Sequence, residues 1–146
     1  MPALKRTPCV GICSTTYGDL VCRGCKRFAH EIVAWNGFDD DQRGRVWQRL
    51  HELLAGAVSA HLLIVDLPRL EQLADELRIA EREAINDQVL AFEVLRRCAR
   101  RGMSLTSMGI EGRAEQVAGT LLEVIELEYF QRSMARYEHD FRTLAQ

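Results

Sequence analysis

The chain has 146 residues, of which 47% are hydrophobic and 27% are charged, with a formal net charge of −2 at pH 7. This composition is typical of a globular protein and excludes an intrinsically disordered chain. No apolar run approaches the roughly 18 residues of a membrane-spanning helix, so we expect no transmembrane segment. The length allows one ordinary domain, or a small module attached to a larger helical one.

The N-terminal 30 residues are basic, and the remainder of the chain is net negative. Lys5 and Arg6 are not followed by the apolar segment of about 7–15 residues that marks a secretory signal peptide. We therefore expect a cytoplasmic protein. In that reducing compartment clustered cysteines are more often metal ligands than disulfides, and two short disulfide-closed loops are the alternative.

Residues 8–27, PCVGICSTTYGDLVCRGCKR, contain four of the five cysteines: Cys9, Cys13, Cys22 and Cys25. The spacing is C-x3-C-x8-C-x2-C, so two close pairs flank a loop that lets them face each other. Four thiolates are typical of a closed tetrahedral site for Zn²⁺ or for iron with sulfide. Metal ligation would replace the hydrophobic core that so short a segment cannot build. The spacing therefore predicts one four-cysteine site that holds zinc or an iron–sulfur cluster.

Residues 8–50 resemble the small bacterial YdhL-like family of predicted iron–sulfur proteins, also described as domain of unknown function 1289. The shared features are the four cysteines, the CRGC turn, the run from Glu31 to Trp35, and an acidic turn before an arginine-rich helix. The resemblance covers the N-terminal third of the chain and implies a metal or cluster on the four cysteines, but no reaction. At Arg27, Phe28 and His30 the chain departs from the Arg-Thr-acidic pattern common in the family, which indicates a different local cap.

Two short helices are expected after the cysteines. The first begins near Lys26 and ends at the turn signal Asn36–Gly37, and the second is capped by the acidic run Asp39–Asp41. Trp35 and Trp47 lie on the apolar faces of these helices, and we interpret them as core anchors. Together with the cysteine loop, these helices make up a predicted metal-binding module of residues 1–55.

Residues 56–67 form a predicted connecting segment. Its largely apolar run, HLLIV, is compatible with a strand, but the sequence offers no second convincing strand to pair with it. We therefore expect the preceding helix to continue to about residue 64 and to break at Asp66–Pro68. Pro68 suits the first turn of the next helix, with Asp66 or Leu67 as its cap.

Residues 68–146 are predicted to form a long antiparallel helical hairpin. Nothing between Pro68 and Arg101 demands a break, although Asn86–Asp87 favours a kink. A glycine-rich loop at 102–112 follows, and a second apolar stripe runs from Val117 to Leu144. Similar helix lengths joined by one loop favour a coiled-coil-like seam. The expected fold class is mainly α.

Further candidate site residues lie outside the four cysteines. His30 is an additional candidate metal ligand, but an ordinary surface histidine is the preferred interpretation. His61 is expected to be packed or half-exposed, and Cys98 to be a core thiol. The arginines around Cys98 have two interpretations: they complement the negative end of the helix dipole, or they contact an acidic partner or nucleic acid.

The sequence contains no phosphate-binding glycine loop, no H-E-x-x-H motif, no serine nucleophile elbow and no Glu-x-x-His pair of a di-iron bundle. The main hypothesis is therefore a non-catalytic metal-binding accessory protein whose C-terminal helices dock a protein partner or self-associate. One alternative is a redox or electron-transfer iron–sulfur protein. A further alternative is a zinc-clipped nucleic-acid-binding module that uses Arg6, Arg23, Lys26 and Arg27.

Overall fold

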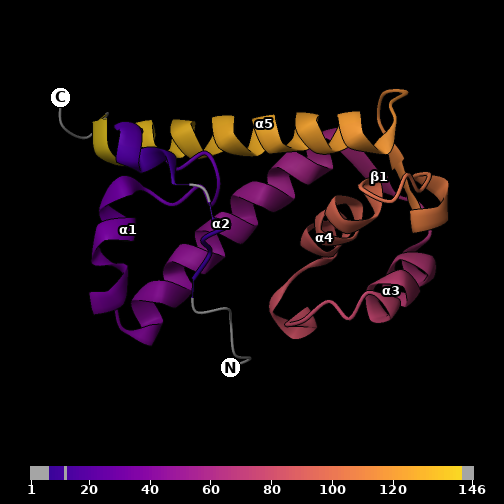
Figure 1. Cartoon of the computed structure of the whole chain (residues 1–146), viewed down its shortest axis with the longest axis horizontal. Helices are drawn as coiled ribbons and strands as arrows, with labels where there is room; N and C mark the ends of the chain where they lie inside the picture. Colours follow the sequence, from indigo (N-terminus) through magenta and orange to yellow (C-terminus); the bar gives the residue numbers. More distant parts are fainter. Residues whose placement is uncertain (1–6, 12, 143–146) are drawn as a thin grey trace. The chain divides into compact units, whose positions relative to one another are not determined.

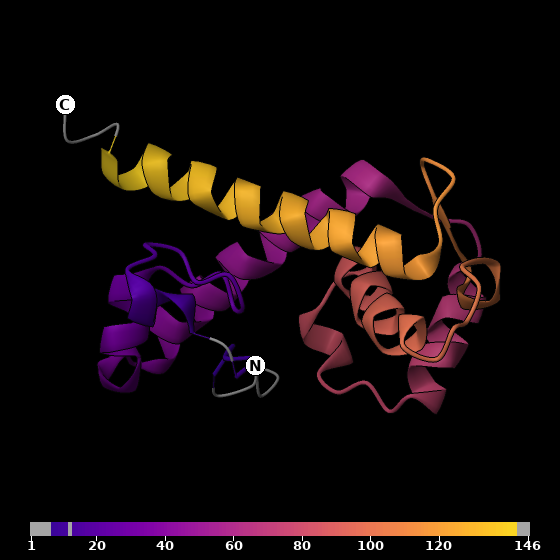
Figure 2. The ribbon, with the colours of Figure 1, turned by 45° about the horizontal axis from the view of Figure 1, so that its top comes forward.

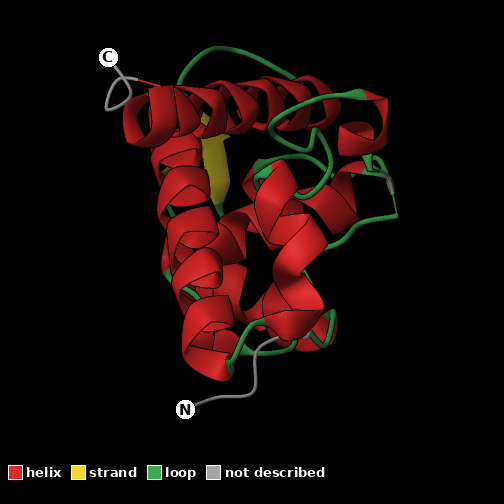
Figure 3. Ribbon diagram, turned by 90° about the vertical axis from the view of Figure 1, so that its left-hand side faces the viewer, coloured by secondary structure: helices red, strands yellow, loops and turns green. Residues whose placement is uncertain are grey.

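The computed structural model describes residues 7–11 and 13–142, so Lys5, Arg6 and Leu144 lie outside the described residues. Five α-helices and one short pair of strands account for most of this part of the chain (Figures 1 and 3). The mainly α fold is confirmed. In the described part of the chain, none of the helices combines the length and the low polarity needed to cross a bilayer.

The chain divides into two compact units. The cysteine unit comprises, within the described residues, 7–53 and 129–142; the central unit comprises 54–128. Helices α2 (Asp40–His61) and α5 (Ala118–Tyr137) each contribute residues to both units. This division differs from the predicted domains, because the end of the C-terminal helix groups with the cysteine-rich segment and not with residues 68–128.

The helix ends in the cysteine unit follow the expected signals, except for the start of the first helix. Helix α1 (Ala29–Ala34) begins three residues after the expected Lys26, whose φ of +65° is not helical. It passes into a 3-10 turn, Trp35–Gly37, and α2 begins at Asp40. Asp39 caps α2: its Oδ1 accepts the N–H of Gln42 at 2.8 Å, and its own N–H donates to Gln42 Oε1 at 2.9 Å. Such a reciprocal pair satisfies N–H groups that the first helical turn leaves without partners.

The tryptophans are core residues of this unit, as predicted. Trp35 is buried in a cluster with Val46 and Leu50 from α2, and Trp47 packs against the same cluster from its edge. Aromatic side chains bury a large apolar area each, so a few of them can anchor a short helix pair.

The central unit contains a strand pair that the sequence pattern did not predict. Helix α2 ends at His61, and β1 (Leu62–Ile64) pairs antiparallel with β2 (Ile110–Gly112). The expected helical continuation to residue 64 is therefore wrong. The partner strand β2 is only three residues long and ends in glycine, so it carries almost no strand signal of its own.

The predicted unbroken helix from Pro68 to Arg101 is also wrong. The segment forms α3 (Leu67–Glu76), a 3-10 turn at Arg82–Ala84 and α4 (Asp87–Ala99), and α3 and α4 pack side by side (Figure 2). The Asp66 cap of α3 is as expected, since its side chain accepts the N–H of Arg69. Asn86, expected to kink a helix, instead caps α4 by accepting the N–H of Val89.

Cys98 is fully buried on α4, and burial raises the pKa of its thiol, as expected for a core residue. His61 is half-buried, with its Nε2 atom 3.2 Å from Oε1 of Glu128. These two predictions are confirmed.

Gly109 is the backbone position on which this unit's strand pairing depends most directly. It has φ +79°, and a Cβ atom there would lie 2.4 Å from the carbonyl oxygen of Asp66. The Gly109 carbonyl accepts the N–H groups of Val65 and Asp66, both at 3.0 Å. Glycine is therefore required here both for its conformation and for close approach.

We expect Gly109→Ala to lower the free energy of unfolding by about 2–3 kcal/mol, because left-handed strain and a backbone clash add. Gly102 provides a matched control, since it also has positive φ (+69°) but no atom within 4 Å of the position that a Cβ would take. Gly102→Ala should cost only about 1 kcal/mol. Urea denaturation of both variants measures the difference, and equal losses would contradict a role for close packing at Gly109.

Candidate metal centre

The cysteine loop is built from two tight turns. Cys13 precedes a 3-10 turn, Ser14–Tyr17, which ends at Gly18 with φ +99°. The second turn is closed by two backbone hydrogen bonds, from Cys22 N to Arg27 O and from Lys26 N to Cys22 O, both 2.9 Å long. Val21 and Phe28 form a bridge at the base of this turn. The turn holds Cys22 and Cys25 on one short, fixed piece of backbone.

The Cys22 sulfur is surrounded by hydrogen-bond donors. Burial raises the pKa of this thiol, but the backbone N–H groups of Cys25, Ser14 and Gly24 all donate to it, and the net effect lowers the pKa below its usual value. The Cys25 side chain also contributes a hydrogen bond. Donors directed at sulfur stabilise the thiolate, which is the form that binds metals. Cys22 is thus buried in an environment suited to a negatively charged sulfur.

Cys13 and Cys25 lie near Cys22 and interact with it electrostatically. Hydrogen bonds from the Thr15 and Thr16 side chains lower the pKa of Cys13, whose Sγ lies 2.9 Å from Thr15 Oγ1. Burial raises the pKa of Cys25, although its Sγ accepts a hydrogen bond from Arg27 Nε at 3.2 Å. The structure therefore gives Cys13 and Cys25 different local surroundings, and each of them is within electrostatic range of Cys22.

Cys9 is placed differently. It is exposed, and its Sγ accepts the N–H of Gly11 at 3.4 Å, within its own turn. All five cysteines are free thiols, so no disulfide closes this loop. Within the described residues, no group of three or more His, Cys, Asp or Glu side chains is close enough together to hold a metal ion. The donors around Cys13 and Cys22 fit thiolate ligation, whereas no three of the four described sulfurs are gathered closely enough to hold a metal ion.

Two buried cations follow the last cysteine of the loop, and the sequence pattern did not assign them to the metal site. Lys26 and Arg27 have relative exposures of 3% and 5%. Lys26 Nζ donates to Gly24 O at 3.0 Å and lies 4.9 Å from the Tyr129 ring centroid; the Arg27 guanidinium lies 4.9 Å from the Trp35 ring centroid. Arg27, which donates to the Cys25 sulfur, would offset part of the negative charge of a thiolate there.

Burial of these cations also bears on the nucleic-acid interpretation. Lys26 and Arg27 are not available to contact a phosphate backbone, and Arg6 lies outside the described residues. Arg23 is exposed, but it pairs with Asp19 at 3.4 Å. In the sequence, Lys26 and Arg27 stand out only as two basic residues after the last cysteine of the loop. Such a pair is as compatible with an exposed interaction surface as with a buried cluster.

A buried ion pair between Arg49 and Glu31 stabilises the segment that follows the cysteine loop. Arg49 on α2 makes two hydrogen bonds of 2.6 Å to the carboxylate of Glu31 on α1, and Glu31 Oε1 also accepts the N–H of Phe28 at 2.9 Å. The Arg49 guanidinium lies 3.9 Å from the centroid of the Phe28 ring. Because Phe28 follows the cysteine turn directly, this network fixes where that turn ends.

Aromatic rings from the C-terminal part of the cysteine unit complete the packing. Phe28 contacts the rings of Tyr137 and Phe141, with centroids 5.2 and 5.6 Å away. His30 is exposed and its ring lies against Phe141, which agrees with its interpretation as a surface histidine. These four rings all belong to the cysteine unit, so the loop and residues 129–142 share one small core.

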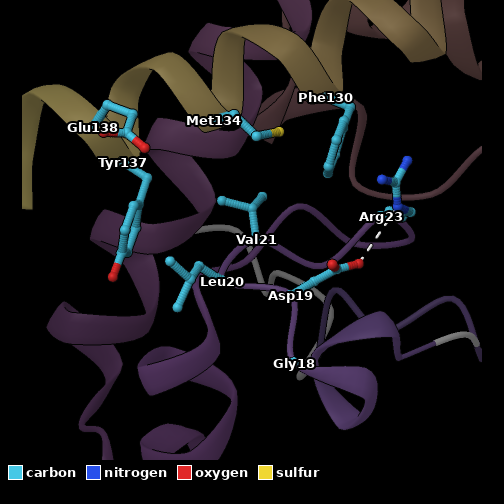
Figure 4. A pocket seen from close by; sticks show the side chains of 9 residues that line it. All are labelled: Gly18, Asp19, Leu20, Val21, Arg23, Phe130, Met134, Tyr137 and Glu138. Carbon is cyan, nitrogen blue, oxygen red and sulfur yellow. Dashed lines mark ion pairs between the residues drawn. The ribbon is translucent and has the colours of Figure 1, made fainter.

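A hollow of about 220 Å³ lies beside the cysteine loop (Figure 4). The loop contributes Gly18–Val21 and Arg23. Helix α5 contributes Phe130, Met134 and Tyr137, and the short π-helix after it, Glu138–Arg142, contributes Glu138. Figure 4 shows Val21 and Met134 facing each other across it, with the Asp19–Arg23 ion pair at one side. The Arg23 guanidinium lies 4.7 Å from the Phe130 ring centroid.

Comparison with known proteins agrees with the resemblance of the cysteine segment. No curated protein and no solved structure is significantly similar to the chain. The segment that carries the four cysteines, α1 and the first part of α2 does have a counterpart: residues 7–54 match the family model described as "Protein of unknown function (DUF1289)".

Proposed function

We propose that the protein is a metal-binding accessory protein and that the cysteine unit is its metal-binding part. The observation that carries the proposal is the set of three backbone N–H groups that donate to the buried Cys22 sulfur. A neutral thiol gains little from three donors, whereas a metal-bound thiolate is stabilised by each of them. The match of residues 7–54 to a family model, over the segment that carries this chain's four cysteines, is compatible with the same function.

The proposed ligands are Cys13, Cys22 and Cys25, with Cys9 as the fourth. Cys9 and Cys13 are separated by only three residues, one of which, Gly11, has φ +92°. Four thiolates suit either a structural Zn²⁺ ion or an iron–sulfur cluster. When bound, such a centre would cross-link the two turns of the loop and would substitute for a hydrophobic core there.

Metal analysis combined with absorption spectroscopy tests this proposal. The full-length protein is purified without oxygen, and its zinc, iron and acid-labile sulfide contents are measured. One equivalent of zinc in a colourless protein supports a structural zinc site. Iron with sulfide and a visible charge-transfer absorption supports a cluster and favours the redox alternative. Substoichiometric amounts of both metals, after reconstitution with either, would overturn the proposal.

We further propose that the protein self-associates through the hollow beside the cysteine loop. Leu20 and Met134, which line this hollow, remain 41% and 45% exposed, and the neighbouring Tyr17 is 91% exposed. Exposed apolar side chains that gather around a hollow are typical of protein-contact surfaces.

Sedimentation velocity of the wild type and of Met134→Glu tests the proposed self-association. We expect a concentration-dependent dimer for the wild type and a loss of at least about tenfold in dimer affinity for the variant, since a buried charge opposes association. Arg136→Gln changes an exposed residue two positions away and serves as the control. A wild type that stays monomeric at high concentration would contradict self-association.

A further inference from the structure

The central unit contains a second concentration of charge, remote in sequence from the cysteines. A hollow of about 470 Å³ is lined by four arginines, Arg78, Arg97, Arg100 and Arg101, together with Leu77 and one carboxylate, Glu76. Its volume lies within the range of about 300–1,000 Å³ that is typical of small-molecule sites. The arginines come from two segments, the turn after α3 and the end of α4, so the fold has brought them together.

Most of these arginines lack a counterion. Arg97 pairs with Glu93, which also binds Arg96. Among the described residues, Arg78, Arg100 and Arg101 have no ion-pair partner, and all three are exposed. Clustered guanidinium groups without carboxylate partners repel one another, and a multivalent anion relieves that repulsion.

Arg78 supplies an independent observation. It lies just beyond the end of α3 with φ +54°, and Ile79 N donates to Ala74 O at 3.1 Å while Arg78 N donates to Asp75 O at 3.1 Å. This is the Schellman arrangement, whose left-handed position is usually glycine. A long charged side chain in this position carries backbone strain, and such strain is typical of functional sites.

We propose that this hollow binds a small anion that carries two or more phosphate groups, such as inorganic pyrophosphate or a nucleoside diphosphate. Each phosphate group carries a charge of about −1.5 to −2, so two such groups balance the formal net charge of +3 on the lining residues. The planar guanidinium groups donate to phosphate oxygens in pairs. A set of arginines that converges from two segments on one hollow favours a compact anion over an extended nucleic-acid strand.

The competing interpretation is that these arginines only complement the C-terminal ends of α3 and α4. The two interpretations differ at Arg78. If its side chain serves the helix end alone, Arg78→Gly should lower thermal stability and leave anion binding unchanged. If it serves a ligand, Arg78→Gly should weaken binding, while removal of the left-handed strain keeps the midpoint of unfolding unchanged or raises it.

Isothermal titration of the full-length protein with pyrophosphate at low ionic strength tests the proposal. We expect binding of one equivalent, weakened at higher salt, and a loss of about tenfold or more in affinity for each of Arg78→Gly and Arg100→Gln. Arg45→Gln, at an exposed arginine of α2 in the cysteine unit, is the control and should bind as the wild type does. ADP as a second titrant separates the two sources of the anion: equal affinities assign recognition to the phosphates, and tighter ADP binding assigns a nucleotide.

The absence of pyrophosphate and ADP binding would overturn the proposal. Equal losses of pyrophosphate affinity in the Arg78→Gly and Arg45→Gln variants would also overturn it. A short single-stranded RNA is the third ligand to be titrated. RNA binding that pyrophosphate does not displace would also overturn the small-anion assignment, because it would show that the arginines recognise an extended backbone.

Discussion

Replacement of Cys22 by serine should lower the affinity for the bound metal by more than about a hundredfold, since even loss of a group that only orients a ligand costs about 10- to 100-fold. Cys22 is the most buried of the four candidate ligands, with a relative exposure of 1%, and three backbone N–H groups converge on its sulfur. A serine oxygen binds zinc and iron weakly and sits too far from donors that are placed for sulfur. Metal content after anaerobic purification measures the effect.

The same variant should loosen the whole cysteine unit and leave the central unit intact. Residues 129–142 belong to the cysteine unit, and Tyr137 and Phe141 pack on Phe28 beside the loop. We therefore expect faster amide hydrogen exchange in residues 13–31 and 129–142, and unchanged protection in 62–99. Cys98→Ser is the control: it alters a buried thiol of the central unit and should keep its metal. Retention of metal by Cys22→Ser would remove the basis of the proposed site.

Replacement of Glu31 by alanine should lower the free energy of unfolding by about 3–5 kcal/mol, the cost of leaving one partner of a buried ion pair without its counterion. The side chains of Arg49 and Glu31 are only 12% and 8% exposed, and the Nε atom of Arg49 already has no hydrogen-bond partner among the described residues. The variant also removes the acceptor of the Phe28 N–H group. Urea denaturation, followed by circular dichroism, measures the loss.

Two controls separate this effect from a general loss of charge on the helices. Glu52→Ala removes an exposed carboxylate of α2 that accepts one hydrogen bond from Gln48, and should change stability by less than about 0.5 kcal/mol. The double variant Glu31→Gln with Arg49→Met removes both charges and should recover more than half of the loss, because no buried charge then lacks a partner. A Glu31→Ala variant as stable as Glu52→Ala would contradict the structural role of this pair.

Signals that act over a few residues predicted local structure correctly. The Asp39 and Asp66 caps, the Asn36–Gly37 stop and the packed tryptophans lie where the sequence pattern predicts them. Each of the caps and the stop depends on a backbone group and a side chain within about one helical turn, so the residues that decide it are neighbours in the chain.

Structure that depends on contacts between distant segments of the chain could not be predicted in the same way. The segment after Pro68 has an apolar period suited to one helix, but a Schellman turn at Arg78 and a cap at Asn86 divide it. The strand at 62–64 forms only because residues 110–112 lie beside it, with Gly109 permitting the close approach. Helix and strand propensities of such short runs are similar, so packing decides between them.

The amino-acid sequence by itself determined the mainly α class, the helix caps and the set of four clustered cysteines, because these follow from composition and from spacing along the chain. Only the tertiary structure decided that Lys26 and Arg27 are buried, that residues 129–142 group with the cysteine loop, and that four arginines share one hollow. The physical reason is that burial and charge grouping depend on which distant segments pack together, and the free energies of competing packings differ by only a few kcal/mol.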